Sequence, residues 1–341
     1  DIADKVISQK RINENFLARP AMQEISLQVI LSTVFGVAQG ELFEQLKQLI
    51  GSIFDIFTNP LGASFIYLPA LQKDLGKWSP WGRFVEQKKQ INELLYALIR
   101  ERKAENDPER EDILSLMLSA RDEAGEPMTD EQLRDELMTL LFAGHETTAT
   151  ALAWALYWIH SLPEVKEKLL QELDTLDENA DPSVITKLPY LSAVCSETLR
   201  IYPVGLFTFA RIVKEPIQIM GYEFEPGTIL SPCIYLTHHR EDLYPQPKQF
   251  KPERFLERQY SPYEFLPFGG GNRRCLGMAL ALFEMKLVLA TIMSRYQLEL
   301  AENRPVKPVR RGVTIAPAGG VRMVMKGQRQ AIAKTLVSQA G

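Results

Sequence analysis

Apolar residues recur at helical spacing through most of the first half of the chain. The longest such run covers 128–162, where Thr129 followed by Gln132 is typical of a capped helix start and Pro163 of a helix end. The same spacing predicts further helices at 21–37, 41–57, 81–105, 110–121, 164–176 and 188–201. We therefore expect a helical region over 1–201, interrupted by a long connection at 59–80 that is rich in proline and glycine.

The pattern changes after residue 201. Alternation over 211–220, a turn-rich stretch and an apolar run at 229–236 predict a small strand region. A proline-rich segment at 244–267, a helix at 278–294 and short strands over 296–325 follow, with a tail at 326–341. The fold class is mainly α, and we predict one domain over 1–341, with a helical region at 1–201 and a β-rich region at 202–325.

Composition narrows the class of protein. A net charge of -4 over 341 residues and a pI near 5.8 argue against nucleic-acid binding, which needs a strongly basic surface. The three cysteines are too widely spaced for a disulfide framework or a zinc ribbon, which favours a reducing cytoplasm. The longest apolar stretch, 149–159, is too short to cross a membrane.

One cysteine stands in an unusual context. Cys275 lies in FGGGNRRCLG, from Phe268 to Gly277, at the start of a predicted helix. Glycines let the backbone fold over a flat ligand, and the arginines and helix start favour a thiolate that can bind a metal. The loop matches neither a Walker sequence nor a dinucleotide fingerprint. Cys195 and Cys233 have no such context and are interpreted as inert core residues.

Three further segments carry polar residues in notable places. ETLR (197–200) is by itself a weak signal, typical of a surface ion pair, and FKPERF (250–255) adds an arginine. AGHETT (143–148) places helix-weakening residues and a carboxylate inside an apolar helix, which indicates function rather than packing.

Together these segments resemble motifs of the cytochrome P-450 haem-thiolate monooxygenases, in the family's order and across nearly the whole chain. The resemblance implies the P-450 fold, haem b as cofactor and dioxygen as co-substrate, with Cys275 as the axial iron ligand. It implies catalytic proton relay by Glu146 and Thr147. It also implies a structural network of Glu197, Arg200 and Arg254 that supports the cysteine loop. Haem contacts are implied for Phe268, Gly269, Gly277 and Ala143, and contacts with the haem propionates for Arg273, Arg211 and His239.

The resemblance also suggests substrate and partners. Its substrate-facing positions are apolar, as core positions would be, and include Leu141, Phe142, Val204, Phe207, Thr208 and Ile315. The segments 262–292 and 310–320 resemble a bacterial, cyanobacterial-like branch of the family, and this resemblance favours a fatty acid, alkane or terpene-like substrate. Because no flavin or nicotinamide motif occurs, we expect electrons from a ferredoxin or flavodoxin-type donor with its reductase. The protein is expected to be monomeric, with a basic docking face at Arg273, Arg274, Lys248 and Lys251.

Other interpretations remain open. A haem-thiolate isomerase or peroxygenase would share the cysteine loop, and a non-catalytic haem sensor or degenerate fragment would share the fold. Axial ligation by His145 would leave the cysteine loop unexplained, and the adjacent His238 and His239 do not converge easily on one metal. The family's N-terminal part has no counterpart before Asp1, so we expect a fragment that lacks one wall of the pocket.

Overall fold

The computed structural model describes residues 1–58, 68, 72–74, 76, 78–105, 107, 109–177, 180–311 and 314–329. It contains two compact units, one of Asp1–Met22 with Thr148–Gly341 and one of Gln23–Thr147. The helices α2 (Ala18–Thr33) and α7 (Asp130–Ser161) each cross the boundary between the units. Most of the predicted connection at 59–80, and residues 330–341 of the predicted tail, lie outside the described residues.

The second unit consists of helices. Here α3 (Glu41–Thr58) packs on α5 (Pro80–Glu105), and α6 (Ile113–Ser119) packs on α5. The predicted helix at 110–121 is shorter in the structure, because Asp112 acts as its N-cap and accepts a hydrogen bond from the Ser115 amide. Fully buried apolar side chains form the core of this unit, among them Leu46, Ile50, Ile91, Leu95 and Leu133.

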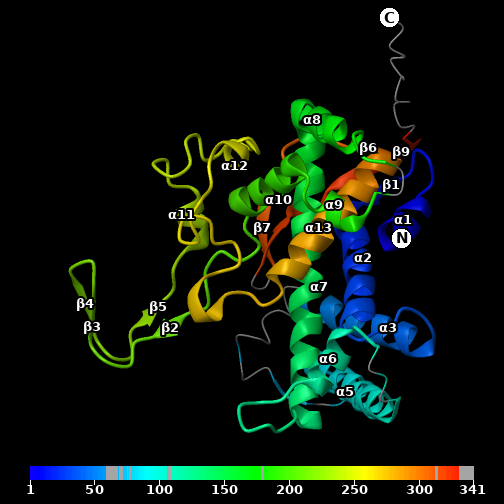
Figure 1. Cartoon of the computed structure of the whole chain (residues 1–341), viewed down its shortest axis with the longest axis vertical. Coiled ribbons are helices and arrows are strands. Elements are labelled where there is room, and N and C mark those ends of the chain that lie inside the picture. Colours follow the sequence, from blue (N-terminus) through cyan, green and yellow to red (C-terminus); the bar gives the residue numbers. More distant parts are fainter. Residues whose placement is uncertain are drawn as a thin grey trace, which may run out of the picture. The chain divides into compact units, whose positions relative to one another are not determined.

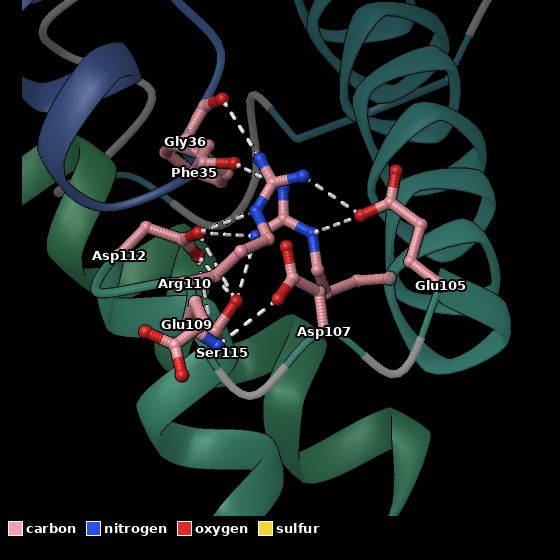
Figure 2. A network of polar contacts seen from close by, with 9 residues as sticks. Phe35, Gly36, Glu105, Asp107, Glu109, Arg110, Asp112 and Ser115 are labelled. Atoms are coloured by element: carbon pink, nitrogen blue, oxygen red, sulfur yellow. Dashed lines mark hydrogen bonds and ion pairs between the residues drawn. The ribbon is translucent and has the colours of Figure 1, made fainter.

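A buried polar network joins three helix ends in this unit (Figure 2). The Asp112 carboxylate accepts from Arg110 Nε at 3.2 Å, as Figure 2 shows. It also accepts from Arg102 Nη1 at 2.5 Å. Arg102 and Arg110 also donate to the carbonyls of Phe35 and Gly36, just after α2. Gly36 has φ +63, and a Cβ there would lie 2.7 Å from the Asp112 carboxylate, so this approach requires glycine. The network therefore fixes the ends of α2 and α5 to the start of α6.

Helices that contact one another form much of the first unit (Figure 1). Within it, α10 (Pro189–Ile201) contacts α8 (Pro163–Leu173), and both contact α13 (Met278–Arg295). Short helices surround them: α1 (Ile2–Ser8) and α9 (Pro182–Ile185) on α13, and α11 (Ile234–His238) and α12 (Arg254–Glu257) on α10. Proline begins α8, α9 and α10, where its missing N–H is not needed by the helix.

The strands form small antiparallel sheets. In the first, β9 (Arg322–Gln328) lies between β1 (Asn15–Leu17) and β6 (Tyr296–Leu300). The remaining pairs are β2 (Arg211–Ile212) with β5 (Ile229–Leu230), β3 (Ile217–Ile219) with β4 (Tyr222–Phe224), and β7 (Pro308–Arg311) with β8 (Thr314–Pro317).

Two expectations from the sequence are wrong in detail. The region 1–201 is not wholly helical, because β1 pairs with β9 from the opposite end of the chain. The apolar run at 229–236 is a strand only at Ile229–Leu230, and from Ile234 it continues as helix α11. Both errors arise because pairing partners distant in sequence decide between strand and helix in short apolar runs.

The longest described helix is α7, with 32 residues. Its predicted capping box is confirmed: the Gln132 amide donates to Thr129 Oγ1 at 3.2 Å, and the Thr129 amide donates to Gln132 Oε1 at 2.8 Å. The helix ends at Ser161, before Pro163 begins α8. In the part of the chain that the structure describes, no helix combines the length and apolarity needed to cross a membrane.

Candidate functional site

A buried carboxylate on α10 joins two arginines. The Glu197 and Arg200 side chains are both 0% exposed, and Arg200 donates to the Glu197 carboxylate through Nε at 2.7 Å and Nη2 at 2.8 Å. Arg254 at the start of α12 donates to the same carboxylate at 3.2 Å, as does the Lys251 amide at 2.8 Å. Such a two-pronged, charge-assisted pair is geometrically specific. It fixes α10 to the segment that precedes α12.

The remaining donors of the two arginines reach backbone carbonyls. Arg200 donates to the carbonyls of His238, at 2.8 Å, and Gln249, at 3.2 Å, and Arg254 donates to that of Pro245, at 3.1 Å. A buried charge is tolerated when its hydrogen-bonding groups are satisfied in this way. The network therefore holds the irregular segment between α11 and α12, which has little regular structure of its own.

The cysteine loop has a tightly folded backbone. The Cys275 amide donates to the Phe268 carbonyl at 2.9 Å, which closes the loop. Gly269 and Gly271 have φ of +70 and +62, a conformation that other residues rarely adopt. A Cβ at Gly270 or Gly271 would meet no atom within 4 Å, so this side of the loop is open.

The three cysteines differ in access. Cys195 is fully buried, and burial raises the pKa of its thiol to about 12. Cys233 is half-buried and its thiol lies 3.6 Å from the Leu206 carbonyl. Cys275 is exposed, and the next residue, Leu276, is 93% exposed. Among the three, Cys275 is therefore the most exposed and the most accessible to a ligand.

The start of α13 lies beside this thiol. Gly277 is the N-cap of α13, and a Cβ on Gly277 would lie 3.9 Å from Cys275 Sγ. A side chain at this position would therefore contact the sulfur and narrow the approach to it. A helix N-terminus also favours negative charge nearby. The Cys275 sulfur thus lies at the first residues of α13 on an exposed residue.

In the second unit, the polar cluster on α7 is held by α2. Gln23 Nε2 donates to the Glu146 carboxylate at 2.7 Å, and the Gln23 carbonyl accepts from His145 Nε2 at 3.0 Å. Thr147 Oγ1 donates to the Ala143 carbonyl at 2.6 Å, within its own helix. A Cβ on Gly144 would lie 2.7 Å from the Ile30 side chain, so glycine permits the close packing of α2 on α7.

The three residues expected to bind carboxylates, Arg211, His239 and Arg273, have different contacts. Arg211 in β2 is exposed and donates to the Phe209 carbonyl at 2.5 Å. The His239 ring stacks on Tyr235 with centroids 4.0 Å apart, and its Nδ1 lies 2.9 Å from the Tyr235 carbonyl. Arg273 ends the short turn Gly271–Arg273 in the cysteine loop. Among the described residues, no hydrogen bond or ion pair joins the three to one another.

The apolar candidates for substrate contact fall into two groups. In the first unit, the Ile315 amide donates to the Val204 carbonyl at 2.9 Å, so the segment after α10 lies along β8. Phe207 in this segment is 56% exposed, and Thr208 is half-buried. Leu141 and Phe142 lie on α7 in the second unit, Leu141 with a fully buried side chain.

Sequence reasoning missed Gln23, because a glutamine in a helix belongs to no recognisable motif. Its contact with Glu146 joins residues 123 positions apart. Hydrophobic spacing identifies the face of a helix, but it cannot identify which polar side chain on another helix will meet it.

Known proteins show matching sequence and structure. The family model "Cytochrome P450" matches residues 2–321. A protein of Mycobacterium bovis named as cytochrome P450 135B1 is 36% identical over 96% of this chain and 67% of its own length. A Mycobacterium tuberculosis protein named as cytochrome P450 135A1 is 33% identical over 96% of this chain and 70% of its own. None of these names states a reaction.

Two solved structures show the same fold. The structure of retinoic acid-bound cyanobacterial CYP120A1 aligns with a TM-score of 0.80 and 27% identity, over 96% of this chain and 72% of that one. The haem domain of cytochrome P450DA aligns with a TM-score of 0.83 at 24% identity, over the same shares of the two chains. The cysteine loop and the Glu197 network thus lie in a known fold.

Proposed function

The chain belongs to the cytochrome P450 family, and from this membership we propose that it is a haem-thiolate monooxygenase of a hydrophobic substrate. The observation that supports this function most directly is that Cys275 is exposed on a loop closed by a backbone hydrogen bond. A structural cysteine would be buried, as Cys195 is.

The residues of the loop fit a haem. A haem iron takes a thiolate as axial ligand, and Cys275 supplies the accessible thiol among the three cysteines. The open side of Gly270 and Gly271 leaves room for a flat macrocycle, and the exposed Leu276 offers an apolar surface that such a ring would cover. Phe268, Gly269, Gly277 and Ala143 are further proposed haem contacts.

Charged groups complete the proposed site. Arg211, His239 and Arg273 are the proposed partners of the two haem propionates, because two carboxylates need cationic or N–H donors. The network of Glu197, Arg200 and Arg254 does not take part in the chemistry. Its role is to hold the backbone that leads into the cysteine loop.

A haem b held by Cys275 would supply the oxygen chemistry: with two electrons and two protons, one atom of dioxygen would enter a C–H or C=C bond and the other would leave as water. We assign the delivery of protons to Glu146 and Thr147. Gln23 donates to the Glu146 carboxylate, and the Thr147 hydroxyl, which donates to the Ala143 carbonyl, can still accept a hydrogen bond from a proton donor. To pass a proton on, the Thr147 hydroxyl would accept one proton as its own leaves, which requires it to turn away from the Ala143 carbonyl.

The proposed substrate is lipid-like: a fatty acid, alkane or terpene. The candidate contacts Leu141, Phe142, Val204, Phe207 and Ile315 are apolar, and Thr208 adds one hydroxyl. The related cyanobacterial protein is named with bound retinoic acid, an apolar chain that ends in a carboxylate. Electrons are proposed to come from a ferredoxin or flavodoxin-type donor and its reductase, with a basic docking face at Arg273, Arg274, Lys248 and Lys251.

Turnover distinguishes this function from ligand sensing. The haem-loaded protein is supplied with NADPH through a surrogate ferredoxin and ferredoxin reductase, and NADPH consumption is followed with and without a long-chain fatty acid. A monooxygenase consumes NADPH faster with substrate and releases a product heavier by one oxygen atom. Binding of the fatty acid without any such product would identify a sensor and contradict the proposal.

A further inference from the structure

His238 ends α11 and is fully buried. Both of its ring nitrogens have backbone partners in other segments. Nδ1 lies 3.2 Å from the carbonyl of Arg200 on α10, and Nε2 lies 3.0 Å from the amide nitrogen of Leu266, which precedes the cysteine loop. One side chain therefore connects the Glu197 network to the backbone that leads to Cys275.

These partners determine the protonation of the ring. A carbonyl oxygen can only accept, so Nδ1 carries the proton, and an amide N–H can only donate, so Nε2 is an acceptor. A second proton on Nε2 would face the Leu266 N–H. Burial, together with the nearby Arg200 and His239, lowers the pKa of His238 to about 3, so the ring is neutral at physiological pH.

The contact with Arg200 is reciprocal. While His238 Nδ1 donates to the Arg200 carbonyl, Arg200 Nη1 donates to the His238 carbonyl at 2.8 Å. The same guanidinium holds the buried Glu197 carboxylate. Two hydrogen bonds therefore connect His238, the last residue of the five-residue helix α11, to α10.

Aromatic contacts hold the other side of the ring. Phe265 stacks on His238 with centroids 5.4 Å apart and an interplanar angle of 24°. Tyr244 meets the ring edge-on at 6.1 Å, and its hydroxyl donates to the Glu264 carbonyl at 2.9 Å. Three consecutive residues, Glu264, Phe265 and Leu266, are therefore held by His238 and Tyr244.

Backbone hydrogen bonds continue from this point to the thiol. The Gly269 amide donates to the Leu266 carbonyl at 2.9 Å, and the Cys275 amide donates to the Phe268 carbonyl at 2.9 Å. Leu266 is thus a point at which the N-terminal end of the cysteine loop is attached to the rest of the unit. A shift of its amide would shift the turn that presents the thiol.

We propose that His238 is a positioning residue for the Cys275 thiolate: its neutral imidazole couples α10 to the start of the cysteine loop and holds the sulfur where the haem iron requires it. This inference rests on the proposed haem-thiolate function and adds a residue that its motifs do not include. His238 does not touch the reacting atoms, and it acts through Leu266 and the loop backbone.

Three substitutions separate its contacts. His238→Phe keeps an aromatic ring between Phe265 and Tyr244 but removes both hydrogen bonds. His238→Gln keeps an acceptor within reach of the Leu266 amide, whereas His238→Asn keeps a donor near the Arg200 carbonyl but is too short for Leu266. The matched control is His160→Gln. His160 belongs to the same unit, and burial lowers its pKa to about 3 as well, but its Nδ1 contacts the carbonyl of Leu156 within its own helix.

The readout is the Soret band of the reduced carbon-monoxide complex of the haem-loaded protein, which is red-shifted only under thiolate ligation. We expect His238→Phe to lose at least half of the red-shifted band, His238→Gln to restore more of it than His238→Asn, and His160→Gln to retain it. In the haem-free protein, amide hydrogen exchange should rise at residues 264–276 in His238→Phe and not in His160→Gln.

The outcomes are distinguishable. A wild-type protein without a red-shifted band contradicts the proposed function itself. A wild-type band that persists unchanged in His238→Phe contradicts the role of His238. The band could also be lost in all three His238 variants and in His160→Gln, in proportion to their lowered thermal stability. That result would show a general packing effect and would equally overturn the role of His238. If His238→Phe does not fold, the order of His238→Gln above His238→Asn remains the deciding comparison.

Discussion

Gln23 on α2 donates a 2.7 Å hydrogen bond to the carboxylate of Glu146 on α7, across 123 positions of sequence. A hydrogen bond to a carboxylate is stronger than one between neutral groups, so this contact sets where Glu146 lies. If Glu146 delivers protons in the proposed reaction, Gln23 determines how well it does so.

Gln23→Leu should lower the yield of oxygenated product per NADPH consumed. The variant replaces the donor by an apolar side chain of similar size. We expect the product yield to fall about tenfold, less than the about 100-fold or more that proton transfer itself contributes to the rate. Product and NADPH are measured together through a surrogate redox chain. Gln28→Leu, also a half-buried glutamine of α2, is the control. Equal yields in both variants and the wild type would contradict a role for Gln23.

Thr147→Val should be more severe than Thr147→Ser. Valine keeps the β-branched shape but has no hydroxyl to donate to Ala143 or to relay a proton, whereas serine keeps the hydroxyl. We expect valine to reduce the rate of product formation by about 100-fold and serine to reduce it by less than about tenfold. A solvent deuterium isotope effect on the same rate should grow only in the variants that lose activity. Similar activity of valine and serine would remove Thr147 from the proton pathway.

Glu197→Gln should destabilise the first unit. It removes one partner of a buried network and leaves Arg200 and Arg254 without their shared carboxylate, a change that costs about 3 kcal/mol of unfolding free energy or more. Chemical denaturation followed by tryptophan fluorescence measures it. The control is Glu253→Gln, which affects the more exposed pair with Lys168 and should cost about 1 kcal/mol or less. Equal losses in the two variants would contradict the buried role of Glu197.

Asp112→Asn should weaken the second unit in a pH-dependent manner. Burial alone would raise the pKa of Asp112, but hydrogen bonds from Ser115 and Arg102 outweigh it and lower the pKa below its ordinary value. Because the pKa is lowered on folding, the stabilisation is present above the unfolded pKa of about 4 and is lost as pH falls through the folded pKa.

The variant keeps an N-cap acceptor for Ser115 but loses the charge beside Arg102. We expect it to be less stable than the wild type by about 2 kcal/mol at pH 7, with the difference shrinking below about pH 4. Urea unfolding at several pH values measures this. A difference that stays constant from pH 7 to pH 3 would show that the charge of Asp112 does not contribute.

Local signals in the sequence predicted much of the helical structure. Thr129 and Gln132 marked the start of α7, and Pro203 follows the end of α10 at Ile201. These features succeed because caps and prolines act within one turn of the chain. The motif FGGGNRRCLG was similarly informative. Its glycines predicted a tightly folded backbone, and Gly269 and Gly271 have the positive φ angles that such a loop requires.

Contacts between distant segments could not be predicted in this way. His238 and His239 are adjacent and identical in type, yet one is fully buried between Arg200 and Leu266 while the other stacks on Tyr235. Which of the two turns inward depends on where α10 and the cysteine loop lie, and helical spacing carries no information on that. The pairing of β1 with β9 was missed for the same reason.

We propose that the thiol of the exposed Cys275 is the axial ligand of a haem. The most direct measurement is the reduced carbon-monoxide difference spectrum of the haem-loaded protein beside that of Cys275→Ser, with Cys233→Ser as the control for loss of a cysteine. We predict a red-shifted Soret band in the wild type and in Cys233→Ser, and its loss in Cys275→Ser. A red-shifted band that persists in Cys275→Ser would contradict the account.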